Sequence, residues 1–311
     1  MGTQNKAQID KLLTEASNGY FPASHIADMI FPVLRKTQTS GKLGKYGNDH
    51  LRIVNTLVNG EGKYRRVRPI TKSTQSYYIE GHGLTDLVTE EDFNNTDKPF
   101  DARKDTTIGL TQLLKVEKEY AVASVLTNTS VLTQNITLSG TSQWSDYDNS
   151  DPISNIRTGQ NAILDGSGMA ANVAIMDQKV FNTIQYHPEL LAKLGFSANR
   201  AGILSKDDIA SALNVERVLV SAVRYNSAKE GQTDVLSAVW GKSLVMAYIP
   251  TQAVPRQQSL GYDVRHPGTD YKVYKWNENN PPNSESVLVE NPYDILLSNV
   301  GCAYLIKDII A

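Results

Sequence analysis

The feature that most constrains this chain is a polar, extended stretch with too few apolar residues to form a core of its own. Residues 51–58 and 63–70 predict two extended runs on either side of the turn signal Asn59-Gly60-Glu61-Gly62. A long hairpin with so little apolar surface is not stable by itself. We therefore expect it to lie on another surface. The second run carries the basic residues Lys63, Arg65, Arg66 and Arg68.

The remaining composition is that of a folded protein. The 311 residues are 40% hydrophobic and 21% charged, which suits about two domains. The net charge of −2 argues against a strongly basic nucleic-acid binder. The single cysteine, Cys302, excludes an intramolecular disulfide and zinc sites built on several thiolates. We find no signal-peptide core and no run of about 18 apolar residues, so we expect a protein made in a reducing cytoplasm with no membrane span.

The clearest helix is predicted over residues 101–127. Leu110, Leu114 and Val125 recur at helical spacing, and at 1.5 Å per residue the helix spans about 40 Å. We expect one apolar stripe and one charged face. A helix of this length suits a scaffold for other elements better than a binding site.

Helices and strands alternate between residues 151 and 250, which indicates a compact α/β domain. Asp151-Pro152 is typical of a helix start, and Ser205 with Asp208 has capping-box spacing. Further strands are predicted after this domain, in a β-rich tail from 259 to 311. The strands expected in the two regions are 172–176, 215–223, 234–239, 243–249, 271–275, 286–290, 294–298 and 303–306.

No residue pattern in the chain indicates catalysis. The five histidines have no metal-ligand spacing, and the chain has no phosphate-binding glycine loop. Asp165-Gly166-Ser167-Gly168 follows a predicted helix, so it fits a tight turn better than a nucleophile elbow. Cys302 lies in an apolar segment and is expected to be a buried, inert thiol. We predict no catalytic residue, no metal and no cofactor, with an α/β enzyme on 151–250 as the less favoured alternative.

The basic run has three interpretations. It could bind phosphates, although no glycine-rich loop accompanies it, or it could be a solvated face of the hairpin. It could also pair with an acidic surface on a second copy of the chain, which we rank above phosphate binding. The candidate acidic counter-surface consists of Asp86, Glu90, Glu91 and Asp92.

The order of these parts resembles the major capsid proteins of tailed bacteriophages, whose fold is shared with encapsulins. The resemblance covers nearly the whole chain: an N-terminal arm, an extended hairpin, a long helix, an α/β domain and a returning β segment. Three local motifs support it: Trp144 before Asp151-Pro152, the run 172–177 followed by Val180-Phe181 and His187-Pro188, and the closing segment 286–309.

The resemblance implies an α+β capsid fold with named parts. Among them is an extended loop that crosses onto an adjacent subunit. The parts are the N-terminal arm (1–45), the extended loop (46–82), the peripheral domain (83–150) with its spine helix (101–127), the axial domain (151–255), the peripheral return strands (256–298) and the C-terminal strand of the axial domain (299–311).

The resemblance also implies a structural virion protein and no enzyme. Such a chain assembles in the host bacterial cytoplasm into pentamers and hexamers of an icosahedral shell around double-stranded DNA, which it contacts non-specifically. Portal, scaffolding and decoration proteins are possible partners, and an encapsulin-type compartment is the alternative. Some relatives join lysine and asparagine side chains covalently; Lys63 and Asn283 are candidates, but we predict no crosslink.

Overall fold

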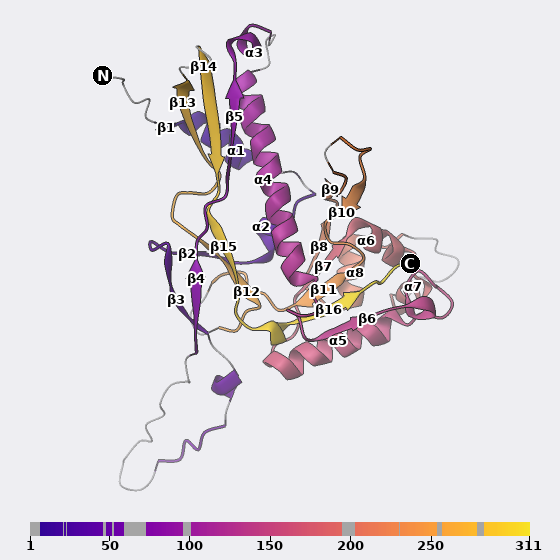
Figure 1. The fold of residues 1–311 in the computed structure, drawn as a ribbon. Coiled ribbons are helices and arrows are strands. Elements are labelled where there is room, and N and C mark those ends of the chain that lie inside the picture. The colour runs from indigo at the N-terminus through magenta and orange to yellow at the C-terminus, as the bar shows by residue number, and fades with distance from the viewer. Residues whose placement is uncertain are drawn as a thin grey trace.

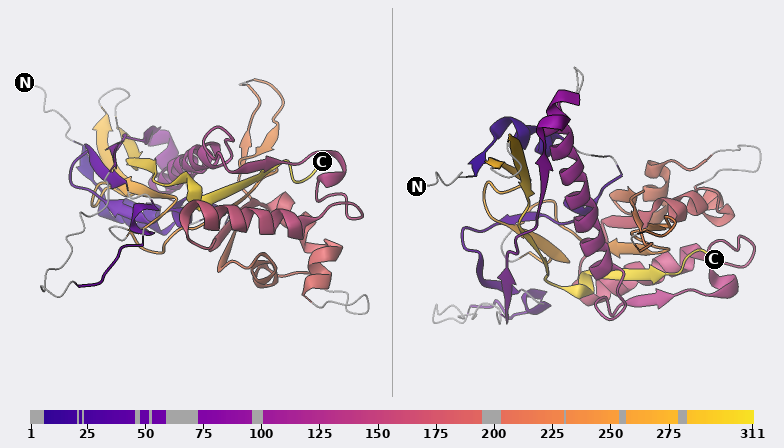
Figure 2. Two further views of the ribbon diagram at one scale, coloured as in Figure 1. Left: turned by 90° about the horizontal axis from the view of Figure 1, so that it is seen from below. Right: turned by 45° about the horizontal axis from the view of Figure 1, so that its top comes forward.

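The computed structural model consists of two bodies that meet along one long helix, with a hairpin extending from one of them (Figure 1). The body that carries the hairpin contains the sheet of residues 8–9, 83–88, 272–278 and 284–290, and we call it the peripheral body. The other contains the sheet of residues 135–137, 173–177, 217–221, 244–247 and 303–307, and we call it the axial body. Figure 2 shows the helix lying between the two. The structure describes residues 7–20, 22, 24–45, 48–51, 53–58, 73–95, 101–194, 203–229, 231–253, 257–278 and 283–311.

The long helix, α4 (Ala102–Leu126), confirms the helix predicted over 101–127. It begins where the Asp101 carboxylate accepts a hydrogen bond from the Arg103 amide at 3.0 Å. The expectation of a simple apolar stripe is wrong, because the buried face of α4 also holds Lys115, Lys118 and Glu119. These charged side chains are buried because each finds a polar or aromatic partner on a neighbouring element.

The axial body is built on a five-stranded sheet with the order β6-β16-β11-β7-β8. Its strands are β6 (Asn135–Thr137), β7 (Val173–Asp177), β8 (Arg217–Ser221), β11 (Leu244–Ala247) and β16 (Ala303–Lys307). Every residue of β7 and β11 is buried because both faces are covered. Alternate residues face two different cores: Ala174 and Met176 pack on the helices of the axial body, and Val173 and Ile175 pack toward α4.

Two axial helices begin where the sequence predicts, whereas the short helix at Pro188–Lys193 was not predicted. Asp151 accepts from the Ser154 amide at 2.7 Å, and Ser205 forms a capping box with Asp208. The turn predicted over Asp165–Gly168 is confirmed only at its last residue: Asp165, Gly166 and Ser167 belong to the helix, and Gly168, with φ of +70°, ends it. The helices are α5 (Pro152–Ser167), α6 (Gln178–Gln185), α7 (Pro188–Lys193) and α8 (Lys206–Leu213), and the small hairpin of β9 (Arg224–Asn226) and β10 (Leu236–Ala238) stands beside them.

The peripheral body contains a four-stranded sheet with the order β1-β13-β14-β5. One face packs Val273, Val287 and Val289 against Leu110 and Leu114 of α4. Strands β13 and β14 confirm the predicted runs 271–275 and 286–290, whereas β1, β5 and the short helix α3 were not predicted. The elements are β1 (Gln8–Ile9), α1 (Lys11–Gly19), β5 (Gly83–Val88), α3 (Glu90–Asn95), β13 (Lys272–Glu278) and β14 (Ser284–Glu290).

A three-stranded sheet, β15-β12-β2, lies between the peripheral body and the hairpin. The pairing of β2 with β12 is parallel and ties the N-terminal arm to the returning part of the chain. Before this strand, the described part of the arm forms the helices α1 and α2. The bounds are α2 (Ala27–Ile30), β2 (Val33–Arg35), β12 (Gly261–Arg265) and β15 (Tyr293–Leu297).

The hairpin that the structure describes is formed by other residues than the predicted runs 51–58 and 63–70. Its paired strands are β3 (Ser40–Lys45) and β4 (Ser73–Tyr78), whereas residues 53–58 form neither helix nor strand and follow the short helix η1 (Asn48–Leu51). Gly41 lies opposite Tyr77 in this pairing, and a Cβ on Gly41 would lie 2.8 Å from the Tyr77 hydroxyl, so a larger residue at position 41 would displace the tyrosine side chain. The predicted run 63–70 lies outside the described residues.

Candidate functional site

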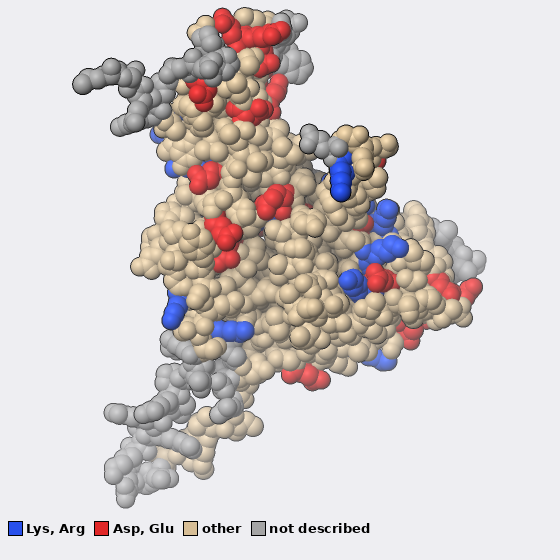
Figure 3. All heavy atoms as spheres, viewed as in Figure 1, with Lys and Arg blue, Asp and Glu red and all other residues tan. Residues whose placement is uncertain are grey.

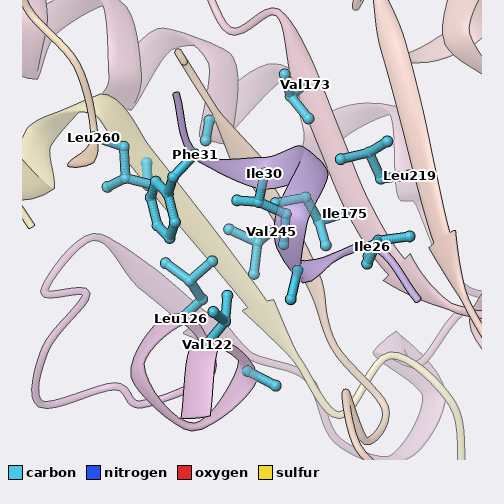
Figure 4. Packing of buried hydrophobic residues seen from close by; sticks show 14 of the residues in the cluster. Ile26, Ile30, Phe31, Val122, Leu126, Val173, Ile175, Leu219, Val245 and Leu260 are labelled. Atoms are coloured by element: carbon cyan, nitrogen blue, oxygen red, sulfur yellow. The ribbon is translucent and has the colours of Figure 1, made fainter. Parts of the chain in front are cut away.

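A buried junction joins the N-terminal arm, α4 and the axial sheet. Figure 4 shows Ile26, Ile30 and Phe31 of the arm between the C-terminal end of α4 and the strands of the axial body. All three side chains are almost fully buried. Each Å² of apolar surface removed from water contributes roughly 25 cal/mol of stabilising free energy. Burial of these three side chains therefore stabilises the position of α2 between the two bodies.

Glu119 is the polar centre of this junction. One of its carboxylate oxygens accepts hydrogen bonds from the Ile26 and Ala27 amides, at 3.0 and 2.7 Å. The other accepts from the Ser221 hydroxyl at 2.9 Å and from the Trp240 indole at 2.6 Å. Burial raises the pKa of Glu119, and these four donors oppose that rise by stabilising the carboxylate. A single side chain thus holds the arm, the helix and the axial body together.

A buried cluster of charged side chains forms around Lys118, the residue directly before Glu119 on the same helix. Lys118 Nζ contacts Asp28 at 2.7 Å and Asp263 at 2.6 Å. Arg265 contacts the same two carboxylates, each at 2.6 Å, and reaches Asp270 at 3.2 Å. The cluster joins α2, α4 and β12, three elements far apart in the sequence. Each positive group shares its carboxylates with the other, so removing one leaves a buried carboxylate under-compensated.

The positive groups of the cluster favour the charged form of the Asp28 carboxyl. Burial alone would raise the pKa of the Asp28 carboxyl, but Lys118 and Arg265 hold that pKa well below its usual range. Tyr271 donates a hydrogen bond to the other Asp28 oxygen at 3.0 Å. Burial, together with the Asp28 charge, raises the pKa of Tyr271, which therefore stays a neutral donor. Asp28 is therefore a charged acceptor for Lys118, Arg265 and Tyr271, and these contacts hold the arm against α4 and β12.

The isolated reactive side chains have structural roles. Cys302 is fully buried and burial raises the pKa of its thiol to about 11, which confirms the expected inert cysteine. His187 is buried with its Nε2 3.0 Å from the Ser150 hydroxyl, and burial lowers its pKa. Among the described residues no group of histidine, cysteine, aspartate and glutamate side chains suits a metal ion. No helix in this part of the chain is long and apolar enough to cross a bilayer.

The predicted acidic residues lie together at the tip of the peripheral body. Asp86 is on β5, while Glu90, Glu91 and Asp92 are on α3, and all four are exposed. Figure 3 shows acidic side chains gathered at this tip. Asp92 also has a local role, since it forms reciprocal hydrogen bonds with Thr89 at the start of α3. These hydrogen bonds lower the pKa of Asp92.

The basic residues of the predicted pairing lie outside the described residues. They are Lys63, Arg65, Arg66 and Arg68. The described residues just before them are strongly exposed: Ile53 is 102% exposed and Leu57 is 81% exposed.

Sequence reasoning missed the junction because its polar members are spread over the chain. Asp28, Lys118 and Asp263 are separated by 90 and 145 positions. One signal was available: Lys115, Lys118 and Glu119 share the face of α4 that also carries Leu114 and Val122. Charged residues within an otherwise apolar face indicate buried ion pairs, although their partners cannot be read from the helix alone.

No family model matches the chain. It is similar to the major capsid protein of Burkholderia phage BcepMu, with 27% identity over 286 residues that cover 86% of this chain and 87% of the relative. It is also similar to the major capsid protein of Pseudomonas phage JBD67, with 24% identity over 243 residues and 77% of each chain covered. These relatives confirm the resemblance inferred from the motifs.

Solved structures agree with the sequence relatives. A phage-related protein from Bordetella bronchiseptica superposes with a TM-score of 0.76 at 23% identity over 98% of both chains. The capsid of cyanophage P-SCSP1u gives a TM-score of 0.60 at 10% identity, covering 93% of this chain and 89% of that one. The chain has the tailed-phage capsid fold. An encapsulin from Synechococcus elongatus shares it, with a TM-score of 0.53 at 8% identity and coverages of 99% and 92%.

Proposed function

We propose that this chain is the shell-forming subunit of a tailed-phage capsid. The observation that carries the proposal is similarity to two curated phage major capsid proteins over most of the chain, combined with the capsid fold. A structural role in a virion capsid follows from these relatives, and no catalytic function is proposed. Because the curated relatives are phage proteins, they favour a phage shell over an encapsulin compartment.

In the proposed shell, copies gather into pentamers and hexamers that enclose double-stranded DNA. Stable shells need large contacts between copies, of about 2,000 Å² or more for each obligate interface. The N-terminal arm and the extended loop increase the contact area that each subunit can offer. A net charge of −2 fits an inner surface that tolerates DNA without condensing it.

Within this function, we assign Lys63, Arg65, Arg66 and Arg68 to contacts with the acidic tip of a neighbouring copy. The exposure of Asp86, Glu90 and Glu91 supports this assignment. Reversing the charge at Arg65, Arg66 and Arg68 should abolish assembly and leave the subunit folded. Circular dichroism would check folding and electron microscopy would count particles. Normal particle yield from the triple variant would contradict the assignment.

Electron microscopy of the purified full-length protein tests the function itself. Closed icosahedral particles are the expected result, formed by the chain alone or after co-expression with the neighbouring phage structural genes. A small soluble oligomer that turns over a substrate would contradict the proposal. DNA inside particles from infected cells would favour the phage assignment, and packaged enzymes would favour the compartment.

A further inference from the structure

The sequence motif Asp165-Gly166-Ser167-Gly168 forms the C-terminal end of α5, and the short helix η1 lies beside it (Figure 1). η1 stands between strand β3 and the residues 53–58. The two segments are distant in the chain, because 118 positions separate Asn48 of η1 from Gly166. The chain therefore touches the axial body of its own copy just before it continues into residues 53–58.

Asn48 uses both ends of its side-chain amide at this contact. Its Nδ2 donates to the Gly166 carbonyl at 2.9 Å, and its Oδ1 accepts from Gln258 Nε2 at 2.6 Å. Gly166 lies in the last turn of α5, where the helix itself supplies no amide for the carbonyl. Asn48 therefore completes a hydrogen bond that α5 cannot make alone. An amide turned the other way would set a donor against the donor of Gln258, so the contact accepts one orientation.

The hydrogen bonds of Asn48 continue into the interior of the subunit. Gln258 is 2% exposed, and its Oε1 accepts from Asn299 Nδ2 at 3.0 Å. Asn299 Oδ1 accepts in turn from the Gly301 amide, also at 3.0 Å, at the start of the short helix η3 (Val300–Cys302). Hydrogen bonds arranged in series reinforce one another. Asn48 thus binds to a partner that is itself fixed by the structure around it.

An apolar contact supports the polar one. A Cβ added to Gly168 would lie 2.7 Å from Leu51 Cδ1, so the leucine occupies the space that a side chain at position 168 would need. Leu51 is 53% exposed, whereas Ile53 and Leu57 beyond it are much more exposed. Of these three aliphatic side chains, Leu51 is therefore the one that α5 partly covers.

The contact accounts for both glycines of the motif. Gly166 has no room for a side chain, because a Cβ there would lie 3.0 Å from the Gly301 carbonyl oxygen. Gly168 has φ of +70°, a conformation that favours glycine, and its missing side chain makes room for Leu51. The Ser167 hydroxyl is satisfied within α5, where it donates to the Ile163 carbonyl at 2.7 Å. The motif thus presents a helix end without side chains, on which η1 docks.

We propose that η1 is a latch: Asn48 and Leu51 dock on the glycine end of α5 in their own copy and set the direction in which residues 53–58 leave the subunit. The docking is a property of the single copy, whereas its role in assembly rests on the proposed shell function. A segment that is held in one direction before it binds loses less conformational freedom on binding. The latch therefore prepares the subunit for assembly.

The latch can open without unfolding the elements around it. Strands β3 and β4 pair with each other, and Leu43 and Tyr77 of this hairpin pack with Tyr262 and Leu296 of β12 and β15. These contacts do not involve η1. An open latch should therefore leave the hairpin and both bodies intact and should release residues 53–58.

The first experiment measures this release in the unassembled subunit. Spin labels are placed at Thr56→Cys and Arg157→Cys, two exposed positions on the released segment and on α5. The native Cys302 is fully buried and should stay unlabelled. In Asn48→Asp the acceptor for Gln258 remains, but the donor is lost and an anionic oxygen faces a carbonyl oxygen. We expect the distribution of distances between the labels, measured by electron–electron double resonance, to widen at least twofold.

Asn55→Asp is the matched control for this experiment. It adds the same charge to the same segment, and its Oδ1 still accepts from the Leu57 amide, as Asn55 Oδ1 does at 3.0 Å. The control should give the distance distribution of the parent chain. An unchanged distribution in Asn48→Asp, or equal widening in the two variants, would overturn the latch.

The second experiment measures the subunit concentration at which half of the chain is in particles, by light scattering and electron microscopy. For Asn48→Asp we expect a rise of about five- to tenfold, the size expected from the loss of one or two hydrogen bonds. Leu51→Ala should give a smaller rise and does not depend on the aspartate variant folding. Values equal to that of the parent in both variants would overturn the role of the latch in assembly. If the parent chain forms no particles, the shell function fails and the distance measurement alone decides whether the latch exists.

Discussion

The axial and peripheral sheets are completed in different ways. In the axial body both faces of the five-stranded sheet are covered by helices or by the arm, and β7 and β11 are wholly buried. In the peripheral body one face packs on α4 and α1, while β5 is an exposed edge with a groove beside it. The axial sheet is thus covered on both faces, with the arm and α4 supplying one of the two covers. The peripheral sheet ends at a strand that pairs on one side with β14.

The largest effect on folding is expected from Lys118→Ala, at the junction between the two bodies. The change leaves Asp28 and Asp263 with Arg265 as their shared cation, in a buried setting. Breaking a buried ion pair in this way costs about 3–5 kcal/mol of the free energy of unfolding. Denaturant titration of the unassembled subunit would measure it.

Lys104→Ala provides the matched control for that prediction. Lys104 is exposed on the first turns of the same helix, so its removal should change the free energy of unfolding by less than about 0.5 kcal/mol. Equal effects of the two alanine variants would show that the buried cluster does not stabilise the junction.

A smaller effect is expected from Glu119→Gln. The amide retains one acceptor oxygen and turns an NH2 group toward two of the four donors that Glu119 satisfies. Buried donors left without an acceptor cost about 1–3 kcal/mol. Because these donors belong to the arm and the axial body, calorimetry should show the two bodies unfolding in more separate steps. A single unchanged transition would contradict the role given to Glu119.

His187 gives the axial body a pH-dependent stability. Its pKa in the folded chain is lowered by burial, so the unfolded chain takes up a proton first as pH falls. Stability should therefore decline as pH drops below about 6.5, the ordinary histidine value. In His187→Gln, which keeps a donor toward Ser150, this decline should be weaker. Identical slopes in parent and variant between pH 7.5 and 5.5 would refute the prediction.

The smallest effect on folding should come from the double variant Ile53→Ser and Leu57→Ser. Both side chains are exposed in the subunit, so the free energy of unfolding should change by less than about 0.5 kcal/mol. If these residues are covered by a second copy, particle yield should nevertheless fall. Thr56→Ser serves as the conservative control in the same segment. Normal assembly of the double variant would place Ile53 and Leu57 outside the contacts between copies.

Local signals in the sequence were sufficient for the elements that carry their own caps and periodicity. Asp151-Pro152, the Ser205 capping box and α4 were all predicted because the signal and the structure lie within a few residues of each other. Strands β7 and β11 were predicted because a strand buried on both faces is a nearly continuous apolar run, which Asp177 interrupts only at the end of β7.

The elements that were missed depend on distant partners. β3 is Ser-Gly-Lys-Leu-Gly-Lys and is a strand through its pairing with β4, whereas residues 53–58 of the more apolar run 51–58 pair with no strand in the part of the chain that the structure describes. β5 was not predicted because its sequence is acidic and shows no strand pattern of its own; it forms a strand by pairing with β14. The junction at Glu119 and Lys118 was missed for the same reason, because the residues that contact these two side chains lie in the arm, β8 and β12.

The position of β16 has a consequence for the order in which the subunit is made. This strand lies between β6 and β11, yet it is synthesised after both of them. Until residues 303–307 have left the ribosome, the two earlier strands cannot be bridged and the axial sheet stays split. A nascent or shortened chain that ends before this strand therefore lacks a finished axial sheet, because the strand that joins β6 to β11 is made after both of them.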